Sequence, residues 1–263
     1  MLYLVPTPIG NLKDITLRAL ETLKECSLIL CEDTKISLKL IRHFDIDTHL
    51  ESYHKFSERK KLNSIISLLE NGDDIALISD AGTPAICDPG ALLIQECVKK
   101  QITITSLPGA CALSVAMSLS GNENAPSQFL GFVPKKGSDK KAFLLKMASF
   151  EGFSFAYDTP HQITKTLKEL ESFEVEIAIF RELTKLHEQI VFGSPKEVAQ
   201  KLTLKGEFVL MVKGKPHLKE QLDEQKLFDK LTQEFNMSPS HAVKLMADLL
   251  NKSKKDLYKL FAQ

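Results

Sequence analysis

The sequence predicts an α/β protein with a largely parallel sheet in its first half, a mixed sheet in its second half and a helical module at its end. Three observations lead to this class. Short apolar runs alternate with helix-spaced patterns over residues 1–120, strand patterns then follow one another more closely, and helix patterns alone remain after residue 215. Strands separated by helices need crossover connections, which place the strands parallel to one another in one sheet.

The first half contains four apolar runs of strand length. Two helix-spaced patterns lie between them, and Ser57, the first residue of the second one, is its expected N-cap. Neither the glycine pattern of a dinucleotide-binding turn nor that of a phosphate-binding loop occurs here, so the usual markers of a nucleotide fold are missing. The expected strands are 2–5, 27–31, 74–78 and 102–106, and the expected helices are 15–24 and 57–71.

Residues 121–136 are expected to form a loop that separates the two halves, with the boundary near residue 120. Closer spacing of the strand patterns beyond it indicates hairpins and therefore a mixed sheet. This organisation gives an α/β domain at 1–120, a second α/β domain at 121–215 and a terminal module at 216–263. The second domain has expected strands at 153–158, 176–182, 188–193 and 207–214, and expected helices at about 160–172 and 195–202.

The terminal module has three short stretches with helix spacing, which together resemble a helix-turn-helix unit. Ser238 followed by Pro239 is a good helix start, and Ser253 with Asp256 matches a capping box. The expected helices fall within 223–236, 238–251 and 253–263.

Charge is balanced, because Lys and Arg together number 34 and Asp and Glu also number 34. With 43% hydrophobic and 26% charged residues the chain is of ordinary globular composition. Zero net charge argues against an indiscriminate polyanion binder, so any contact with nucleic acid has to be local.

Location and metal content are also constrained by the sequence. No apolar run approaches the length of a membrane span, and the N-terminus lacks the pattern of a secretory signal. The 5 cysteines include no CxxC pair and mostly lie in apolar surroundings, where a reduced thiol behaves as a small hydrophobe. A cytoplasmic protein without a metal site is expected.

The strongest candidate for chemistry is SDAGTPAICDPG, residues 79–90, directly after an expected strand. Open α/β sheets bind ligands beyond the carboxyl ends of their strands. Gly82 and Ala81 allow a ligand to approach the main chain, and Asp80 can accept hydrogen bonds from ribose hydroxyls or an ammonium group. The alternative is a tight structural turn.

Other strand ends carry loops of the same kind. In LVPTPIGNL, residues 4–12, Pro6 and Pro8 cannot donate to a sheet and Gly10 permits a sharp turn. LPGACAL, from residue 107, joins a strand to a helix whose free N–H groups suit a carboxylate, although such junctions are often purely structural. The remaining candidates are CEDTK at 31–35, where Asp33 or Thr34 alternatively caps a helix, Tyr53 and His54 in SYHKFSE, His161 in YDTPHQI, and the charge-rich RELTKLHE at 181–188 with His187.

In their order along the chain, these motifs resemble the tetrapyrrole-methylase superfamily. The resemblance rests on TPIGNLKDITLRALETL, CEDT, SYH, SDAGTPAICDPG, LPGACAL, GFVPKK, RELTKLHE and GEFVL, and it covers essentially the whole chain. More narrowly, the chain is similar to the bacterial small-subunit ribosomal RNA 2′-O-ribose cytidine methyltransferases. Two departures are LPGACA, which lacks a second proline after the glycine, and YDTPHQI in place of YESPHR, where Gln162 removes an ion-pairing arginine.

The resemblance implies two α/β domains of the tetrapyrrole-methylase type with S-adenosylmethionine bound in the cleft between them. It implies further that the enzyme is a cytoplasmic homodimer that methylates a cytidine ribose in 16S ribosomal RNA or the small ribosomal subunit. The implied cofactor residues are Pro8, Gly10, Asp80, Ala81, Gly82, Thr83, Ile86, Pro108, Gly109, Ala110, Ala112, Leu183 and Phe208.

A ribose hydroxyl is a poor nucleophile at neutral pH, so a positioned base or cation is expected to assist it. The candidates are Glu32, Asp33, His54 and Lys185, and the last of these is alternatively a phosphate contact. The lysine-rich stretches KKGSDKK (135–141) and KSKKDLYK (252–259) supply local positive charge for RNA, or are simply solvated. The expected RNA contacts are Asn11, Lys135, Lys136, Lys254 and Lys255.

Three rival functions are weighed against this one. Related enzymes methylate tetrapyrrole carbons, but they do not usually carry a terminal helical module. A diphthine-forming methylase fits RELTKLHE less well. The third rival, a cofactor-free RNA-binding protein on a relict fold, conflicts with the intact glycine and proline loops.

Overall fold

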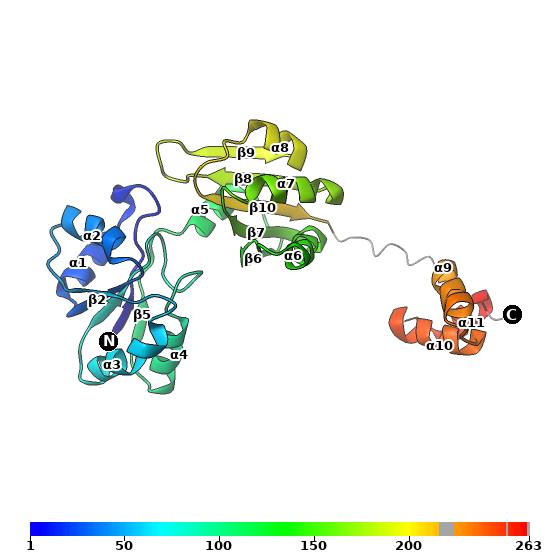
Figure 1. Ribbon diagram of the computed structural model, residues 1–263, viewed down its shortest axis with the longest axis horizontal. Coiled ribbons are helices and arrows are strands. Elements are labelled where there is room, and N and C mark those ends of the chain that lie inside the picture. Colours follow the sequence, from blue (N-terminus) through cyan, green and yellow to red (C-terminus); the bar gives the residue numbers. More distant parts are fainter. Residues whose placement is uncertain (216–223, 251, 262–263) are drawn as a thin grey trace. The chain divides into compact units, whose positions relative to one another are not determined.

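The computed structural model describes residues 1–215, 224–250 and 252–261 of the chain. The chain forms two compact units, Met1–Lys215 and Pro216–Gln263 (Figure 1). Both sheets belong to the first unit, and the described part of the second unit is helical. The predicted terminal helical module is therefore present.

The first sheet is entirely parallel, with strand order β3-β2-β4-β1-β5. The predicted parallel sheet is confirmed, and β3 adds a strand for which the apolar pattern gave no range, because Leu50 is its only apolar residue. All five strands are short, and their carboxyl ends meet at one edge of the sheet. They are β1 (Leu2–Leu4), β2 (Leu28–Cys31), β3 (Leu50–Ser52), β4 (Ile75–Leu77) and β5 (Ile104–Ser106).

Helices cover both faces of this sheet (Figure 1). Along β2, Leu28 and Leu30 pack in one apolar cluster with α3 (Glu58–Glu70) and α4 (Ala91–Lys99). Ile29 and Cys31 point the other way, into a cluster with α1 (Leu17–Glu25) and α2 (Thr34–His43). Alternate residues of a strand face opposite sides, so a strand covered on both faces is apolar throughout.

Capping side chains define where the first helices begin. Thr16 accepts from the N–H of Ala19 at 3.1 Å, and Asp33 accepts from the N–H of Lys35 at 2.8 Å. The prediction that Ser57 caps α3 is wrong in one respect: Ser57 occupies the N-cap position, but its side chain makes no capping bond. Its hydroxyl instead accepts from the His54 N–H and donates to the His54 carbonyl.

The second sheet is mixed, as predicted, with order β6-β7-β10-β8-β9 and only the β6–β7 pair parallel. The prediction of a loop over 121–136 is wrong, since β6 lies within it at the sheet edge. The alternating pattern of a strand is interrupted in β6 by Gly131, which has a φ of +75°. The pairing of β6 with β7 shifts register at this point, between Phe129 and Phe132. The strands are β6 (Ser127–Phe132), β7 (Gly152–Asp158), β8 (Glu176–Arg181), β9 (Gln189–Gly193) and β10 (Phe208–Gly214).

The two faces of the second sheet have different partners. One face packs against helices α6 (Gly137–Ser149), α7 (Ile163–Leu170) and α8 (Pro195–Lys201). The other face forms a cluster with Ile9, from the loop after β1, and with α5 (Ala112–Leu119). Because Ile9 and α5 follow strands of the first sheet, this cluster joins the two sheets into one unit. Two short 3-10 helices complete it, η1 (Leu12–Asp14) and η2 (Glu171–Phe173).

The terminal unit has its own apolar core, which includes Leu231, Val243, Met246 and Leu257. The rings of Phe228 and Phe261 stack at 5.2 Å between centroids. Its elements are α9 (Glu224–Asp229), the π-helical stretch η3 (Lys230–Glu234), α10 (Pro239–Leu250) and α11 (Lys254–Phe261). Helices α10 and α11 begin directly after Ser238 and Ser253, as predicted. Asp223, Asn251 and residues 262–263 of the expected helices lie outside the described residues.

No helix within the described ranges is both long enough and apolar enough to cross a membrane.

Candidate functional site

The loops that follow β1 and β4 are hydrogen-bonded to each other at the carboxyl edge of the first sheet. Thr7 and Gly82 exchange two backbone hydrogen bonds, each of 2.9 Å. The buried Thr7 hydroxyl donates to the Ser79 carbonyl at 3.1 Å. The Thr83 hydroxyl donates to the carbonyl of Ala110, in the loop after β5, at 3.0 Å. Three strand ends therefore share one polar framework.

Glycine is required at two points of this framework. Gly82 has a φ of +83°, and a Cβ there would lie 3.2 Å from Cγ2 of Ile9. A Cβ on Gly109 would lie 2.7 Å from Cβ of Pro6. The first position favours glycine through both its backbone conformation and its close contact, and the second through contact alone.

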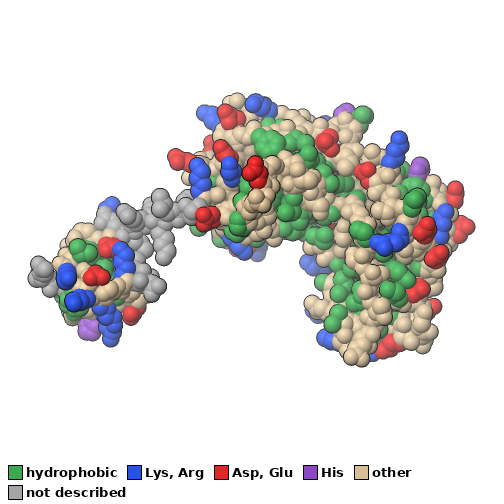
Figure 2. All heavy atoms as spheres, turned by 180° about the vertical axis from the view of Figure 1, so that it is seen from behind, with side chains coloured by type: hydrophobic (Ala, Val, Ile, Leu, Met, Phe, Trp, Pro, Cys, Tyr) green, Lys and Arg blue, Asp and Glu red, His purple; other side chains and the backbone are tan. Residues whose placement is uncertain are grey.

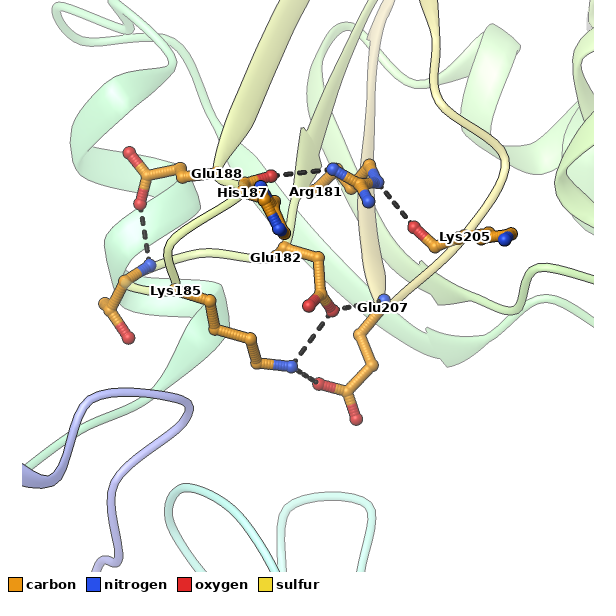
Figure 3. A network of polar contacts seen from close by, with 8 residues as sticks. Arg181, Glu182, Lys185, His187, Glu188, Lys205 and Glu207 are labelled. Atoms are coloured by element: carbon orange, nitrogen blue, oxygen red, sulfur yellow. Dashed lines mark hydrogen bonds and ion pairs between the residues drawn. The ribbon is translucent and has the colours of Figure 1, made fainter.

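A third close approach connects the loop after β1 with the loop after β8. A Cβ on Gly10 would lie 2.2 Å from Cγ of Lys185. The Lys185 Nζ donates to Glu182 at 3.0 Å and to Glu207 at 2.6 Å (Figure 3). Although partial burial lowers the pKa of Lys185, these two carboxylates raise it more, so its net direction is upward. Lys185 is thus a held cation where the two halves meet.

The loop from 182 to 188 is fixed by Arg181, at the end of β8. Its Nε donates to the Lys205 carbonyl and its Nη1 to the His187 carbonyl, at 2.5 and 2.6 Å (Figure 3). Glu182 and Thr184 adopt the left-handed conformation, with φ of +50° and +66°. Two such residues close together carry local strain, which is typical of functional loops whose surroundings hold them in place.

A cavity of about 380 Å³ opens between the two sheets. Its lining combines the loops after β1, β2, β4 and β5 with residues of the second sheet. The cleft between the halves that the resemblance implied is therefore present. The lining residues are Ile9, Glu32, Asp80, Ala81, Gly82, Thr83, Ile86, Cys87, Asp88, Cys111, Ala112, Phe132, Tyr157, Asp158, Thr159, Pro160, Phe180, Leu183, Glu207, Phe208 and Val209.

Three acids of the first half line this cavity and influence one another. Burial, with the charges of Glu32 and Asp80, raises the pKa of Asp88 from 3.8 to about 6. Burial also raises the pKa of Glu32, with a contribution from Asp80. The pKa of Asp80 is raised by burial, although a 3.1 Å hydrogen bond from the Asp33 N–H opposes the shift. Such a group of carboxylates favours a cationic ligand.

The second half contributes aromatic side chains to the lining of the cavity. Phe132 and Tyr157 meet edge to face, with ring centroids 5.3 Å apart, and Phe180 lies near them in the lining. Burial is the main cause that raises the pKa of the Tyr157 hydroxyl, so it stays protonated at neutral pH. The three carboxylates of the first half, called the acidic wall below, and the aromatic side chains of the second half suit a ligand with a cationic part and a flat apolar part.

The predicted cofactor residues fall into two groups. The lining includes Asp80, Ala81, Gly82, Thr83, Ile86, Ala112, Leu183 and Phe208. The others lie outside the lining, in the framework or next to it, and they are Pro8, Gly10, Pro108, Gly109 and Ala110.

Of the four predicted catalytic residues, the cavity lining includes Glu32 only. Asp33 caps α2, which is the structural alternative that the sequence had left open. The ring Nδ1 of His54 accepts from the Phe56 N–H at 3.2 Å. Lys185 contacts Glu207, itself a lining residue.

The predicted RNA contacts Lys135, Lys136, Lys254 and Lys255 are exposed, and Asn11 caps η1 by accepting from the Lys13 N–H at 3.1 Å. One lysine of the 135–141 stretch differs, because Lys140 is 1% exposed. It cannot supply surface charge, and burial lowers its pKa.

Sequence reasoning missed several lining residues, notably Asp88, Phe132, Tyr157 and Glu207. Asp88 lies within the SDAGTPAICDPG loop, and Tyr157 begins the YDTPHQI stretch. Phe132 and Glu207 lie in GFVPKK and GEFVL. The motifs had been found, but which side chain of each faces the cavity depends on bulges and turns that periodicity does not report.

Comparison with known proteins agrees with this architecture. The family model for Tetrapyrrole (Corrin/Porphyrin) Methylases matches residues 1–199. The fold is similar to those of diphthine synthase (TM-score 0.61, 15% identity, 81% of this chain and 89% of the other) and of uroporphyrin-III-C-methyltransferase from Thermus thermophilus (TM-score 0.56, 18% identity, 82% and 94%). The chain belongs to the tetrapyrrole methylase family.

Two similar relatives within that family share one name. A protein of Mycoplasmopsis pulmonis called Ribosomal RNA small subunit methyltransferase I is 45% identical over 216 residues, 80% of this chain and 96% of its own. A protein of the same name from Streptococcus pyogenes serotype M3 is 37% identical over 270 aligned residues, 99% of this chain and 94% of its own.

The framework makes a prediction for Gly82. Gly82→Ala should lower the free energy of unfolding by more than about 1–2 kcal/mol, because an alanine there adopts the left-handed conformation and also crowds Ile9. Urea unfolding measures the loss, and hydrogen exchange at the Thr7 amide should accelerate. Gly72→Ala is the matched control, since Gly72 has φ +98° but nothing within 4 Å of its Cβ position. Equal losses in the two variants, with unchanged Thr7 exchange, would contradict the framework.

The acidic wall makes a prediction for stability against pH. A carboxyl whose folded pKa is raised is more easily protonated in the folded state, so ionising it destabilises the fold. Asp88→Asn should therefore match the wild type near pH 3, gain stability relative to it between about pH 4 and the folded pKa of about 6, and keep that gain at higher pH. Chemical unfolding at each pH gives the difference. Asp139→Asn, at an exposed position, serves as the control. If the curve of stability against pH for Asp88→Asn runs parallel to that of the wild type, the pKa of Asp88 is not raised in the folded state.

Proposed function

We propose that this protein is an S-adenosylmethionine-dependent methyltransferase that methylates the 2′-oxygen of a cytidine ribose in 16S small-subunit ribosomal RNA. The observation that carries the proposal is the similarity to proteins named Ribosomal RNA small subunit methyltransferase I. In one relative this similarity covers 99% of the chain. The cavity between the sheets supports the methyl-donor part of the proposal.

The cavity suits this methyl donor in size and chemistry. Its volume of about 380 Å³ lies within the roughly 300–1,000 Å³ usual for small-molecule sites. S-adenosylmethionine has an amino-acid end with an ammonium and a carboxylate, a positive sulfonium next to it and a flat adenine at the other end, so its net charge is positive. The carboxylates of Glu32, Asp80 and Asp88 favour the cationic part, and the apolar lining of the second half favours the adenine.

We assign the donor's contacts accordingly. Asp80, Ala81, Gly82 and Thr83 would contact the methionine or ribose portion, because they line the cavity and their loop is hydrogen-bonded to the loops after β1 and β5. Leu183 and Phe208 would contact the adenine. Pro108, Gly109, Ala110 and Ala112 would form the adjoining wall. When bound, the donor supplies an already activated methyl group, so placement of the ribose hydroxyl in line with it is the main contribution of the protein, up to roughly 7–11 kcal/mol in favourable cases.

Glu32 is the candidate base that best fits the site. It faces the cavity, and burial raises its pKa toward the neutral range in which a base accepts a proton readily. Lys185 fits a different role. Its pKa is raised by its two carboxylate partners, so it stays charged and can hold a phosphate or orient Glu207.

The terminal unit and the lysines before α6 supply surface charge for RNA in this proposal. Lys254 and Lys255 on α11, and Lys135 and Lys136 before α6, are all exposed. We also propose that the enzyme works in the cytoplasm, where its ribosomal substrate resides, and that it is a homodimer, as the family resemblance implies.

Methylation of a tetrapyrrole or of a diphthine precursor is the rival outcome. The solved structures of uroporphyrin-III-C-methyltransferase and diphthine synthase share 18% and 15% identity with this chain, which supports a common fold rather than a common substrate.

Transfer of labelled methyl groups to purified small ribosomal subunits tests the proposed reaction. Label should appear in a 2′-O-methylcytidine that resists alkaline hydrolysis, because the blocked 2′-oxygen can no longer attack the neighbouring phosphate. Glu32→Gln should lower kcat by about 100-fold or more at saturating donor, in addition to any weaker donor binding that the loss of its negative charge causes, because kcat reports the step after binding. Label on a base, or transfer only to tetrapyrrole or protein substrates, would refute the proposed specificity.

Removal of the terminal unit tests its contribution to RNA binding. A chain ending at Lys215 should fold, because the apolar clusters of the first unit lie within residues 2–212 and that of the terminal unit within 227–261. We expect this chain to bind the donor as before and to bind small subunits about tenfold more weakly, equivalent to about 1.4 kcal/mol. Circular dichroism controls for folding. Unchanged affinity for small subunits would exclude the terminal unit as an RNA contact.

A further inference from the structure

The segment from His54 to Lys60, between β3 and α3, has an unusual surface and is called the rim segment below. Phe56 is 88% exposed, although it is a large apolar side chain. The basic residues Lys55, Arg59 and Lys60 around it are also exposed. Proteins that bind single-stranded nucleic acids combine exposed aromatic rings, on which bases stack, with basic side chains that contact the phosphates.

Hydrogen bonds hold the rim segment in one turn. The Phe56 N–H donates to Nδ1 of His54 at 3.2 Å, and the Ser57 N–H donates to the His54 carbonyl at 2.8 Å. The His54 N–H donates in turn to the Ser57 hydroxyl at 3.0 Å. The Phe56 and His54 rings meet at 6.1 Å between centroids. The ring of Phe56 is therefore displayed by an ordered backbone, which lowers the entropy lost when a ligand stacks on it.

The rim segment is attached to the loop that carries the acidic wall. Glu58 accepts a 2.9 Å hydrogen bond from the N–H of Gly90, two residues beyond the lining residue Asp88. On its other side, His54 lies close enough to Glu32 to lower the pKa of that carboxyl, against the stronger effect of burial. Both contacts place the rim segment beside the acidic part of the cavity.

Charge decides what this surface can attract. The acidic lining repels phosphates, so a polyanionic substrate that reaches the cavity needs cations next to it. Within the described residues, Lys55, Arg59 and Lys60 make no ion pair, whereas Lys61 is paired with Glu51 at 2.8 Å. On the face seen in Figure 2, blue and red side chains are interspersed rather than gathered in one extended basic field. The basic side chains of the rim segment, beside the cavity, are therefore a local source of positive charge for a polyanionic substrate.

We propose that the rim segment binds single-stranded RNA, with Phe56 stacking on a nucleobase close to the methylated ribose and with Lys55, Arg59 and Lys60 contacting the adjoining phosphates. This inference rests on the proposed function and adds a substrate contact to it. A second copy of this chain is a less suitable occupant, because a symmetric contact through this surface would bring like charges together.

Equilibrium binding to purified small ribosomal subunits, measured by filter retention at several salt concentrations, tests the proposal. Phe56→Ala should weaken binding about 5- to 100-fold, the range for loss of one stacked base, with an unchanged salt dependence. Phe56→Tyr should bind like the wild type, and Phe56→Leu should bind like Phe56→Ala, since leucine is apolar but offers no ring. Arg59→Ala and Lys60→Ala should each reduce the slope of log affinity against log salt by about 1.

Leu17→Ala is the matched control, because Leu17 is 78% exposed on α1 and has no part in the proposal. Full binding by Phe56→Ala, rescue by leucine as good as by tyrosine, or an effect of Phe56→Ala on self-association alone would overturn the proposal. Donor binding to the wild type distinguishes a failure of the rim-segment proposal from a failure of the proposed function. If the wild type binds the donor and methylates RNA while the Phe56 variants bind RNA normally, the rim contact fails alone; if the wild type neither binds the donor nor methylates RNA, the proposed function fails.

Discussion

The two backbone hydrogen bonds between Thr7 and Gly82 are the constraint on which the site depends. They fix the loop after β1 against the loop after β4, and Ile9 then packs directly on Gly82. Ile9 is also part of the apolar cluster under the second sheet. A single short segment thus closes one wall of the cavity and connects the two sheets, which is why residues of both sheets line the same space.

Electrostatics divides the surroundings of this cavity into zones of opposite sign. Its inner wall carries Glu32, Asp80 and Asp88, while Lys185 is held between Glu182 and Glu207 on the other half. The exposed cations of the rim segment, which have no ion-pair partner among the residues that the structure describes, lie outside the lining, where a phosphate backbone can reach them. A chain with zero net charge can in this way accept both a cationic donor and a polyanionic substrate, because each meets a different local field.

Much of the fold followed from residue patterns, and the exceptions have physical causes. The fully apolar pattern of strands such as β2 predicted a sheet covered on both faces, and several of the strand-end loops that the sequence singled out line the cavity. Strand β6 was missed because Gly131 and a register shift break its alternation. Ser57 and Lys140 were misjudged because a hydroxyl and a lysine were assigned by type, whereas neighbours determine whether they cap a helix or are buried. The raised pKa of Asp88 could not be predicted from the sequence, because it depends on burial and on the charges of Glu32 and Asp80 in the folded chain.

Binding of S-adenosylmethionine in the cavity can be measured by calorimetric titration of the folded protein with this donor and, separately, with its demethylated product. We expect one binding site for each ligand per chain, with the affinity for the cationic donor rising between pH 5 and pH 7 as the carboxyl of Asp88, with its pKa of about 6, ionises. The absence of binding heat from both ligands over a range of temperatures would contradict this expectation.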